Sequence, residues 1–158
     1  MELSTLTRPE LIFPELPGSD QASALLAFSE RMVEQGIVSS ARALHEKLLE
    51  RENLCSTGVG NGVAIPHCKV KKLDRVIIAV AILQEAVEFG ASDGRLVRLL
   101  FLVLSPEKSP AAHLKSLAAI SKWIQADGHV ERLLEQPDRE SILKLLRQPT
   151  APIDVGVT

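Results

Sequence analysis

The chain has 158 residues, 46% hydrophobic and 24% charged, and its 18 basic and 20 acidic residues give a net charge of −2. A chain of this length buries about 70% of the surface it exposes when unfolded, enough for one core, so we expect a single domain. The near-neutral charge, four Phe, one Trp and absence of Tyr argue against a surface that tracks or stacks on nucleic acid.

Prolines dominate the first 18 residues, with Pro9, Pro14 and Pro17 predicting an extended lead-in instead of a helix. Apolar residues at spacings of three and four then predict a helix over 19–35, capped by Ser19 or Asp20. A second helix is expected from a cap at Ser39 or Ser40 to about residue 52. The faces expected to be buried are Ala22, Leu25, Ser29, Met32 and Val33 in the first helix and Ala41, Leu44 and Leu48 in the second.

The middle of the chain changes to strand patterns. Residues 54–67 alternate glycine with small polar residues, which predicts a shaped loop leading into a short strand. Residues 76–83 are apolar at every position and residues 96–104 at every position but Arg98, as strands covered on both faces should be. A short strand over 86–89 and a turn at Ser92, Asp93 and Gly94 are expected between them.

Ser109 and Pro110 predict the start of a helix that runs to about Ala126. Its expected buried face is Leu114, Leu117, Ala118, Ser121 and Ile124. Short helices are expected over 130–135 and 138–147, followed by an extended or frayed tail over 148–158. Helices around two-face-buried strands predict a layered α/β fold for residues 19–147, with the sheet order left open.

No membrane segment or disulfide framework is indicated. The longest apolar run, residues 76–83, is far shorter than the roughly 20 residues of a spanning helix, and the first residues lack the pattern of a signal peptide. Cys55 and Cys68 are too few for a disulfide framework, which fits a reducing compartment. We therefore expect a cytoplasmic protein that does not insert into membranes.

The glycine-rich loop fits neither common nucleotide motif. Gly58, Gly60 and Gly62 lack the spacing of a P-loop, and they lead toward a strand instead of opening a helix as in a dinucleotide fingerprint. The loop offers open amides and small hydroxyls, and Pro66 restricts the backbone just before His67. A rigid histidine beside such donors suits an anion.

The chemistry of His67 and its neighbours allows four interpretations. The first is a structural histidine that donates to a carbonyl. A zinc site would draw on Cys55, His67 and Cys68, which lack paired ligand spacing. A serine hydrolase would need Ser56 or Ser92 in a nucleophile elbow, which the sequence does not show. A phosphoryl acceptor fits the loop best.

Three motifs stand out in the sequence: the stretch from Arg51 to His67, the turn from Phe89 to Gly94, and His113-Leu114 with Leu117-Ala118. Together they resemble the IIA domains of the phosphotransferase system of the fructose, mannitol and nitrogen-regulatory type. The resemblance covers about residues 20–147. It implies a three-layer α/β/α domain with a mixed β-sheet, and a phosphotransferase that receives phosphate from a histidine phosphocarrier and forms a phosphohistidine intermediate.

The resemblance also implies roles for individual residues. His67 would carry the phosphoryl group, with Nε2 the favoured atom, while Arg51 would stabilise negative charge and His113 would orient or stabilise the acceptor. A place in the first turn of a helix independently favours a neutral His113. For Arg51 the competing interpretation is a solvated charge at a helix end. The predicted phosphate-binding residues are Ser56, Thr57, Gly58, Gly60 and Asn61.

Several residues outside these roles carry weaker expectations. No metal or cofactor is required. Cys55 and Cys68 stand where the family usually has glycine, and both are expected to be small buried thiols. The alternative is a redox role, which would need an exposed, low-pKa thiol. His45 and His129 are expected at the surface. Val59 and Val63 are expected in the core, with docking of the carrier as the alternative.

The partner after His67 depends on the branch of the family. A lone domain favours the nitrogen-regulatory type, in which the phosphorylation state controls a target protein. The alternative is a sugar-specific component that passes phosphate to a IIB partner. A third possibility, from another class, is a non-catalytic binding module with the same fold.

Overall fold

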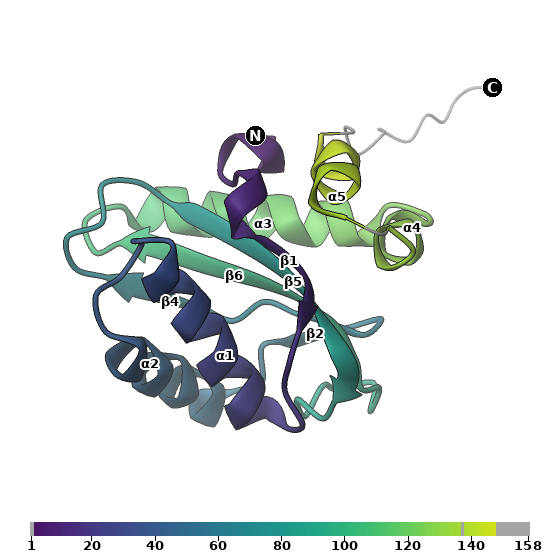
Figure 1. The fold of residues 1–158 in the computed structure, drawn as a ribbon, viewed down its shortest axis with the longest axis horizontal. Helices are drawn as coiled ribbons and strands as arrows, with labels where there is room; N and C mark the ends of the chain where they lie inside the picture. The colour runs from purple at the N-terminus through teal and green to yellow at the C-terminus, as the bar shows by residue number, and fades with distance from the viewer. Residues whose placement is uncertain (1, 137, 148–158) are drawn as a thin grey trace.

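The computed structural model describes residues 2–136 and 138–147. In this part of the chain a six-stranded mixed sheet lies between two layers of helices (Figure 1). Helices α1 (Gln21–Glu34) and α2 (Ala41–Leu54) cover one face, and α3 (Pro110–Gln125), α4 (His129–Leu134) and α5 (Arg139–Leu146) cover the other. The predicted three-layer α/β/α class is confirmed. None of the helices in the described residues is long and apolar enough to cross a membrane.

The sheet is ordered β1-β5-β6-β3-β2, with β4 pairing β6 beside this path. Its strands are β1 (Ile12–Leu16), β2 (Gly58–Gly60), β3 (Val63–Ala64), β4 (His67–Val70), β5 (Ile77–Val87) and β6 (Val97–Pro106). Strand β5 runs antiparallel to β6 and parallel to β1, and both β3 and β4 run parallel to β6. Two short strands therefore share one edge of β6.

Pro66 separates these two short strands. Ala64 pairs with Leu100 and His67 with Val103, so the ladder along β6 is interrupted between them. Proline has no N–H to donate to the ladder, but the Pro66 carbonyl still accepts from the Val103 N–H at 2.9 Å. His67 thereby becomes the first residue of β4.

The core occupies both faces of β5 and β6, as the continuous apolar runs predicted. Alternate side chains of a strand point to opposite faces, so each strand supplies two separate clusters. The cluster under α1 and α2 includes Phe28, Met32, Leu48, Ala81 and Leu102. The cluster under α3, α4 and α5 includes Val80, Phe101, Trp123, Leu133 and Ile142. Of the short strand expected over 86–89, residues 86 and 87 are the end of β5, and residues 88 and 89 lie outside any strand.

The N-terminal lead-in is part of the sheet. Residues 3–5 and 9–11 form single 3₁₀ turns, and β1 then pairs in parallel with β5, with Ile12 opposite Val80. Leu11, Ile12 and Leu16 are buried. Pro14 argued against a strand in this segment of the sequence. However, β1 lies at the end of the sheet order, where a strand tolerates proline because one of its sides has no ladder of hydrogen bonds to maintain.

The predicted helix starts are confirmed. Asp20 caps α1 by accepting from the Ser23 N–H, and the Ser23 hydroxyl returns a bond to the Asp20 N–H, forming a capping box. Ser40 caps α2 by accepting from the Ala43 N–H. Ser109 precedes Pro110 at the start of α3 but makes no side-chain capping bond. The expected tail over 148–158 lies outside the described residues.

The predicted buried faces needed correction. In α1, Ala22 is exposed and Phe28 is buried in its place. In α3, Leu114 is 66% exposed, and neither Leu117, Ala118 nor Ser121 is buried. The buried face of α3 is His113, Ser116, Ile120, Trp123 and Ile124. Two of these are polar, so a pattern based on hydrophobicity alone selected the wrong face.

Candidate functional site

Strand β4 brings His67 to an edge of the sheet that both helix layers reach. Arg51 comes from the last turn of α2 on one side, and His113 comes from the first turn of α3 on the other. These three residues line a hollow of about 620 Å³. The other residues that line it are Lys47, Glu50, Cys68, Lys69 and Glu107. The structure thus brings together the three residues that the sequence nominated for catalysis.

The tautomer of His67 follows from its neighbours. Its Nδ1 lies 2.7 Å from the Ile65 carbonyl oxygen, and a carbonyl can only accept, so Nδ1 carries the proton. In the neutral ring the lone pair is then on Nε2, which accepts from Arg51 Nε at 3.3 Å. Burial lowers the pKa of His67 below 6.5; the bond to Ile65 opposes this and the Arg51 charge adds to it. The ring is therefore neutral at pH 7.

His113 stands beside His67 with a fixed orientation. The two ring centroids are 5.3 Å apart with an interplanar angle of 55°. Its Nδ1 is 2.6 Å from the buried Ser105 Oγ. Burial is the main cause that lowers the pKa of His113, followed by the charges of His67 and Lys69. The expectation of a neutral ring agrees with this direction, although burial, and not the helix terminus, is its main cause.

Arg51 is held in place by two contacts. Its Nη1 donates to the Cys55 carbonyl at 2.8 Å while its Nε faces His67. The side chain is therefore not simply a solvated charge at the end of a helix. A guanidinium fixed in this way offers charged donors next to the His67 nitrogen.

The predicted phosphate-binding loop lies next to the hollow but does not line it. Ser56 Oγ donates to the Phe89 carbonyl and accepts from the Gly58 N–H. Thr57 bonds to Glu52, and the Asn61 N–H donates to the Asp93 carboxylate at 3.0 Å. Gly60 adopts a φ of +95° that few other residues tolerate. Phosphate binding by Ser56, Thr57, Gly58, Gly60 and Asn61 stays a prediction.

Glu52 is a site-building residue that the sequence reasoning missed. Its carboxylate accepts from the Thr57 N–H at 3.1 Å, from the Thr57 hydroxyl, and from Gln21 Nε2 at 3.1 Å. Burial raises the pKa of Glu52 above 4.5, while the bonds from Thr57 and the Arg51 charge act in the opposite direction. A signal was present, because Glu52 lies one helical turn after the buried Leu48 on the same face of α2.

The structure contradicts some of the expectations for other residues and agrees with others. Cys55 is exposed, whereas Cys68 is partly buried and burial raises its thiol pKa to about 11. His129 is buried, with Nδ1 3.1 Å from the Trp123 carbonyl. Val63 is buried as expected, but Val59 is 49% exposed. Within residues 2–136 and 138–147, no three His, Cys, Asp or Glu side chains are arranged to hold a metal ion.

Known proteins share both the sequence and the fold. The family model described as "Phosphoenolpyruvate-dependent sugar phosphotransferase system, EIIA 2" matches residues 5–148. A nitrogen regulatory protein of Bradyrhizobium diazoefficiens is 36% identical over 151 residues, which are 96% of this chain and 98% of that protein. A PTS system fructose-specific EIIA component of Haloferax volcanii is 33% identical over 147 residues, which are 93% and 96% of the two chains.

A solved structure supports the same assignment. The crystal structure of nitrogen regulatory protein IIA-Ntr from Neisseria meningitidis has a TM-score of 0.82 at 26% identity and covers 90% of this chain and 97% of its own. The family match spans almost all of the described residues, including the sheet edge that carries His67. The chain therefore belongs to the EIIA type 2 family of the phosphoenolpyruvate-dependent sugar phosphotransferase system, a family of phosphotransfer proteins.

Proposed function

We propose that this protein is a phosphocarrier that accepts a phosphoryl group on Nε2 of His67 from a histidine phosphocarrier of the phosphotransferase system. The observation that carries the proposal is the bond from Nδ1–H to the Ile65 carbonyl, which leaves the Nε2 lone pair for attack. The P–N bond of the donor phosphohistidine breaks as the Nε2–P bond forms, and the donor imidazole leaves with the electron pair. The His67 proton stays on Nδ1 throughout.

Arg51 supplies the charge that the transferring group requires. In the resting site its Nε points at His67 Nε2, so it must move from the nitrogen to the phosphoryl oxygens when the donor arrives. The bond from Nη1 to the Cys55 carbonyl keeps the guanidinium close during that change. Lys47 and Lys69 add positive charge at the rim of the hollow. Fixed cations of this kind stabilise the equatorial oxygens of a phosphoryl group in transfer.

His113 acts as a neutral donor in this proposal. When the Ser105 hydroxyl donates to Nδ1, the neutral ring carries its proton on Nε2 and can donate that proton to a phosphoryl oxygen. Ser105 is then the positioning residue that selects this tautomer. We assign Ser56 and Thr57 a supporting role, because their hydroxyls already bond to Phe89 and Glu52.

The surface around the hollow suits a partner that binds and leaves. Leu54 follows Arg51 at the end of α2 and is 82% exposed, and Leu114 follows His113 and is 66% exposed. Apolar side chains displayed beside a shallow polar site are typical of a small, transient interface. We place the donor phosphocarrier on this surface, in the cytoplasm.

We favour the nitrogen-regulatory branch, because the Bradyrhizobium and Neisseria proteins are both described as nitrogen regulatory. In that branch the partner after His67 is a regulatory target. The fructose-specific relative supports the alternative, in which His67 passes its phosphoryl group to a IIB component. The arrangement of His67, Arg51 and His113 favours either over a binding module that no longer transfers phosphate.

Incubation with phosphoenolpyruvate, the general phosphotransferase enzyme and its histidine carrier tests the proposal. Intact mass should show one added, acid-labile phosphoryl group on the wild type and none on His67→Ala. His45→Ala is the matched control and should be labelled normally, because the His45 ring contacts the Ala22 carbonyl of α1 at 2.8 Å and is not among the residues that line the His67 hollow. His113→Ala should bind the carrier but transfer slowly. An unlabelled wild type with an active cognate carrier contradicts the proposal, and equal labelling of His67→Ala contradicts the site.

A fructose-type IIB component separates the two branches. Rapid loss of the label from phosphorylated protein on mixing with IIB supports the sugar-specific alternative. A stable label under the same conditions supports the regulatory branch.

A further inference from the structure

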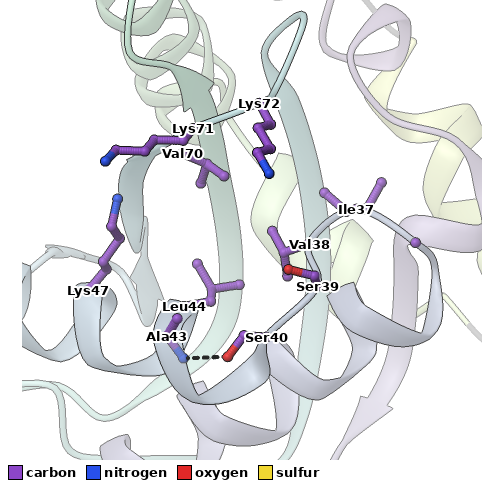
Figure 2. Close-up of a pocket in the computed structure, with 11 residues that line it drawn as sticks. Ile37, Val38, Ser39, Ser40, Ala43, Leu44, Lys47, Val70, Lys71 and Lys72 are labelled. Carbon is purple, nitrogen blue, oxygen red and sulfur yellow. Dashed lines mark hydrogen bonds between the residues drawn. The ribbon is translucent and has the colours of Figure 1, made fainter.

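A second hollow, separate from the His67 site, lies where the start of α2 faces the end of β4 (Figure 2). Its volume is about 590 Å³, within the range of small-molecule sites, which is roughly 300–1,000 Å³. The floor is apolar and comes from four residues that pack on or belong to the core, namely Ile37, Val38, Leu44 and Val70. We call this hollow the lysine pocket, because Lys47, Lys71 and Lys72 also line it.

Lys47, Lys71 and Lys72 line the pocket together with its apolar floor. Figure 2 shows the Lys72 amine directed over the floor near Val38, with the amines of Lys47 and Lys71 ending at the opposite side. No Asp or Glu is among the described residues that line it, although the whole chain carries a net charge of −2. None of the three lysines forms an ion pair in the part of the chain that the structure describes.

The backbone of Lys72 has an uncommon conformation. Its φ is +64°, a left-handed conformation that glycine or asparagine adopts far more readily than lysine. Residues in such sparsely populated backbone conformations cluster at functional sites. At this position the backbone turns the Lys72 amine toward the pocket instead of away from it.

We propose that the lysine pocket binds a small organic anion, with one phosphate or carboxylate group on an apolar body. The anionic head lies between the Lys72 ammonium group on one side and those of Lys47 and Lys71 on the other, and the apolar body covers Ile37, Val38 and Val70. An unpaired cluster of three cations attracts anions and repels cations, which sets the class of ligand. The apolar floor beneath the lysines favours a small molecule with an apolar body over a membrane headgroup or an acidic side chain, because neither of these would cover that floor.

The pocket adjoins the His67 hollow without being part of it. Lys47 lines both, and its Nζ donates to the Lys69 carbonyl at 2.9 Å, two residues beyond His67 on β4. The remaining lining residues differ between the two hollows. Binding in the lysine pocket therefore needs no phosphoryl transfer, and the proposal does not rest on the proposed function.

Hexyl phosphate is a suitable probe, with hexanoate, hexylammonium and inorganic phosphate as comparisons. In titrations followed by amide chemical shifts, hexyl phosphate and hexanoate should shift the resonances of Val38, Val70 and Lys72. The shifts should saturate with a Kd of about 10 mM or less. Inorganic phosphate should bind about tenfold more weakly, because it lacks the apolar body. Hexylammonium should leave these resonances unchanged. Equal binding of hexylammonium, or no saturation by hexyl phosphate, overturns the proposal.

Variants separate this pocket from other anion sites on the protein. Lys71→Gln with Lys72→Asn removes two charges while keeping a residue that tolerates positive φ, and should raise the Kd for hexyl phosphate about tenfold. Lys122→Gln with Lys144→Gln removes two exposed lysines on α3 and α5 and is the matched control, with an unchanged Kd. His67→Ala should also bind normally.

Three further results would overturn the proposal. The first is an unchanged Kd in the pocket variant, and the second is a set of shifts confined to Ile65 and Cys68 beside His67. The third is sedimentation with phosphatidylglycerol vesicles that depends on Lys71 and Lys72 while hexyl phosphate fails to bind, because it would assign the lysines to a membrane surface.

Discussion

Replacing Glu52 with alanine should loosen the loop that leads to His67. The carboxylate is the acceptor for the buried Thr57 N–H and hydroxyl, and Thr57 is only 4% exposed, so water cannot easily take its place. Two buried donors left without an acceptor cost about 1–3 kcal/mol each. Part of this cost is offset, because the substitution also removes a carboxylate whose ionised form is disfavoured by burial. We expect Glu52→Ala to lower the free energy of unfolding by about 2–4 kcal/mol.

Urea unfolding followed by circular dichroism measures this loss. Glu52→Gln is the conservative comparison and should cost about 1 kcal/mol or less, because its amide oxygen accepts from the Thr57 N–H and its NH₂ donates to the Thr57 hydroxyl oxygen. Glu30→Ala removes an exposed carboxylate from α1 and should change stability by less than about 0.5 kcal/mol. A Glu52→Ala protein as stable as Glu30→Ala would refute the assigned role.

The pH dependence gives a second check on Glu52. Because burial raises its folded pKa above 4.5, the folded protein binds this proton more tightly than the unfolded chain does. Stability of the wild type relative to Glu52→Gln should therefore fall as pH rises from about 4.5 through the raised folded pKa, and should be constant above it. The opposite slope would mean that the bonds from Thr57 outweigh burial.

Three other predictions test the site and its surroundings. The rate at which His67 accepts a phosphoryl group should be constant from about pH 8 to about pH 6.5 and fall only at lower pH, because burial lowers the pKa of both His67 and His113. Single-turnover labelling measures this rate, and a midpoint above pH 6.5 would contradict the prediction. Iodoacetamide at about pH 8 should alkylate the exposed Cys55 well before Cys68, whose thiol pKa is about 11, as peptide mass spectrometry can show. Leu114→Ser should change the free energy of unfolding by less than about 0.5 kcal/mol in urea while weakening binding of the carrier, whereas a loss of about 2–5 kcal/mol would mean that Leu114 is buried.

The sequence predicted those parts of the fold that depend on local pattern. The two-face-buried strands, the caps Asp20 and Ser40, and the proline at the start of α3 are all local features, and all are present. The strand β1 was not predictable in this way, because Pro14 argues against a strand and only the free edge beside β5 permits it. Sheet order depends on contacts between distant segments, and it was left open for that reason.

The buried face of α3 shows how polar contacts defeat a hydrophobic pattern. His113 and Ser116 occupy buried positions because each has a hydrogen-bond partner, Ser105 Oγ for the first and the Ala112 carbonyl for the second. Because these two residues are buried, Leu114 faces outward, although the pattern of apolar spacing predicted that it would face the core. The same turn of the helix that exposes Leu114 aims His113 at His67.

The resemblance to a known family located Arg51, His67 and His113, but it did not explain why they meet. Paired residues of neighbouring strands share a face of the sheet, and His67 pairs with Val103, which packs in the cluster under α3. Cys68 pairs with Leu104 and packs against the opposite cluster, under α1 and α2.

A shift of one residue in the β4 register would therefore exchange the faces of His67 and Cys68 and turn a thiol toward His113. The interruption at Pro66 sets where β4 starts, because the chain resumes its ladder with the Val103 N–H bonded to the Pro66 carbonyl. His67 then faces α3 at a strand that has β6 on one side only, so Arg51 can reach its Nε2 around the edge from α2. The site depends on register at a sheet edge, which no pattern within a single segment records.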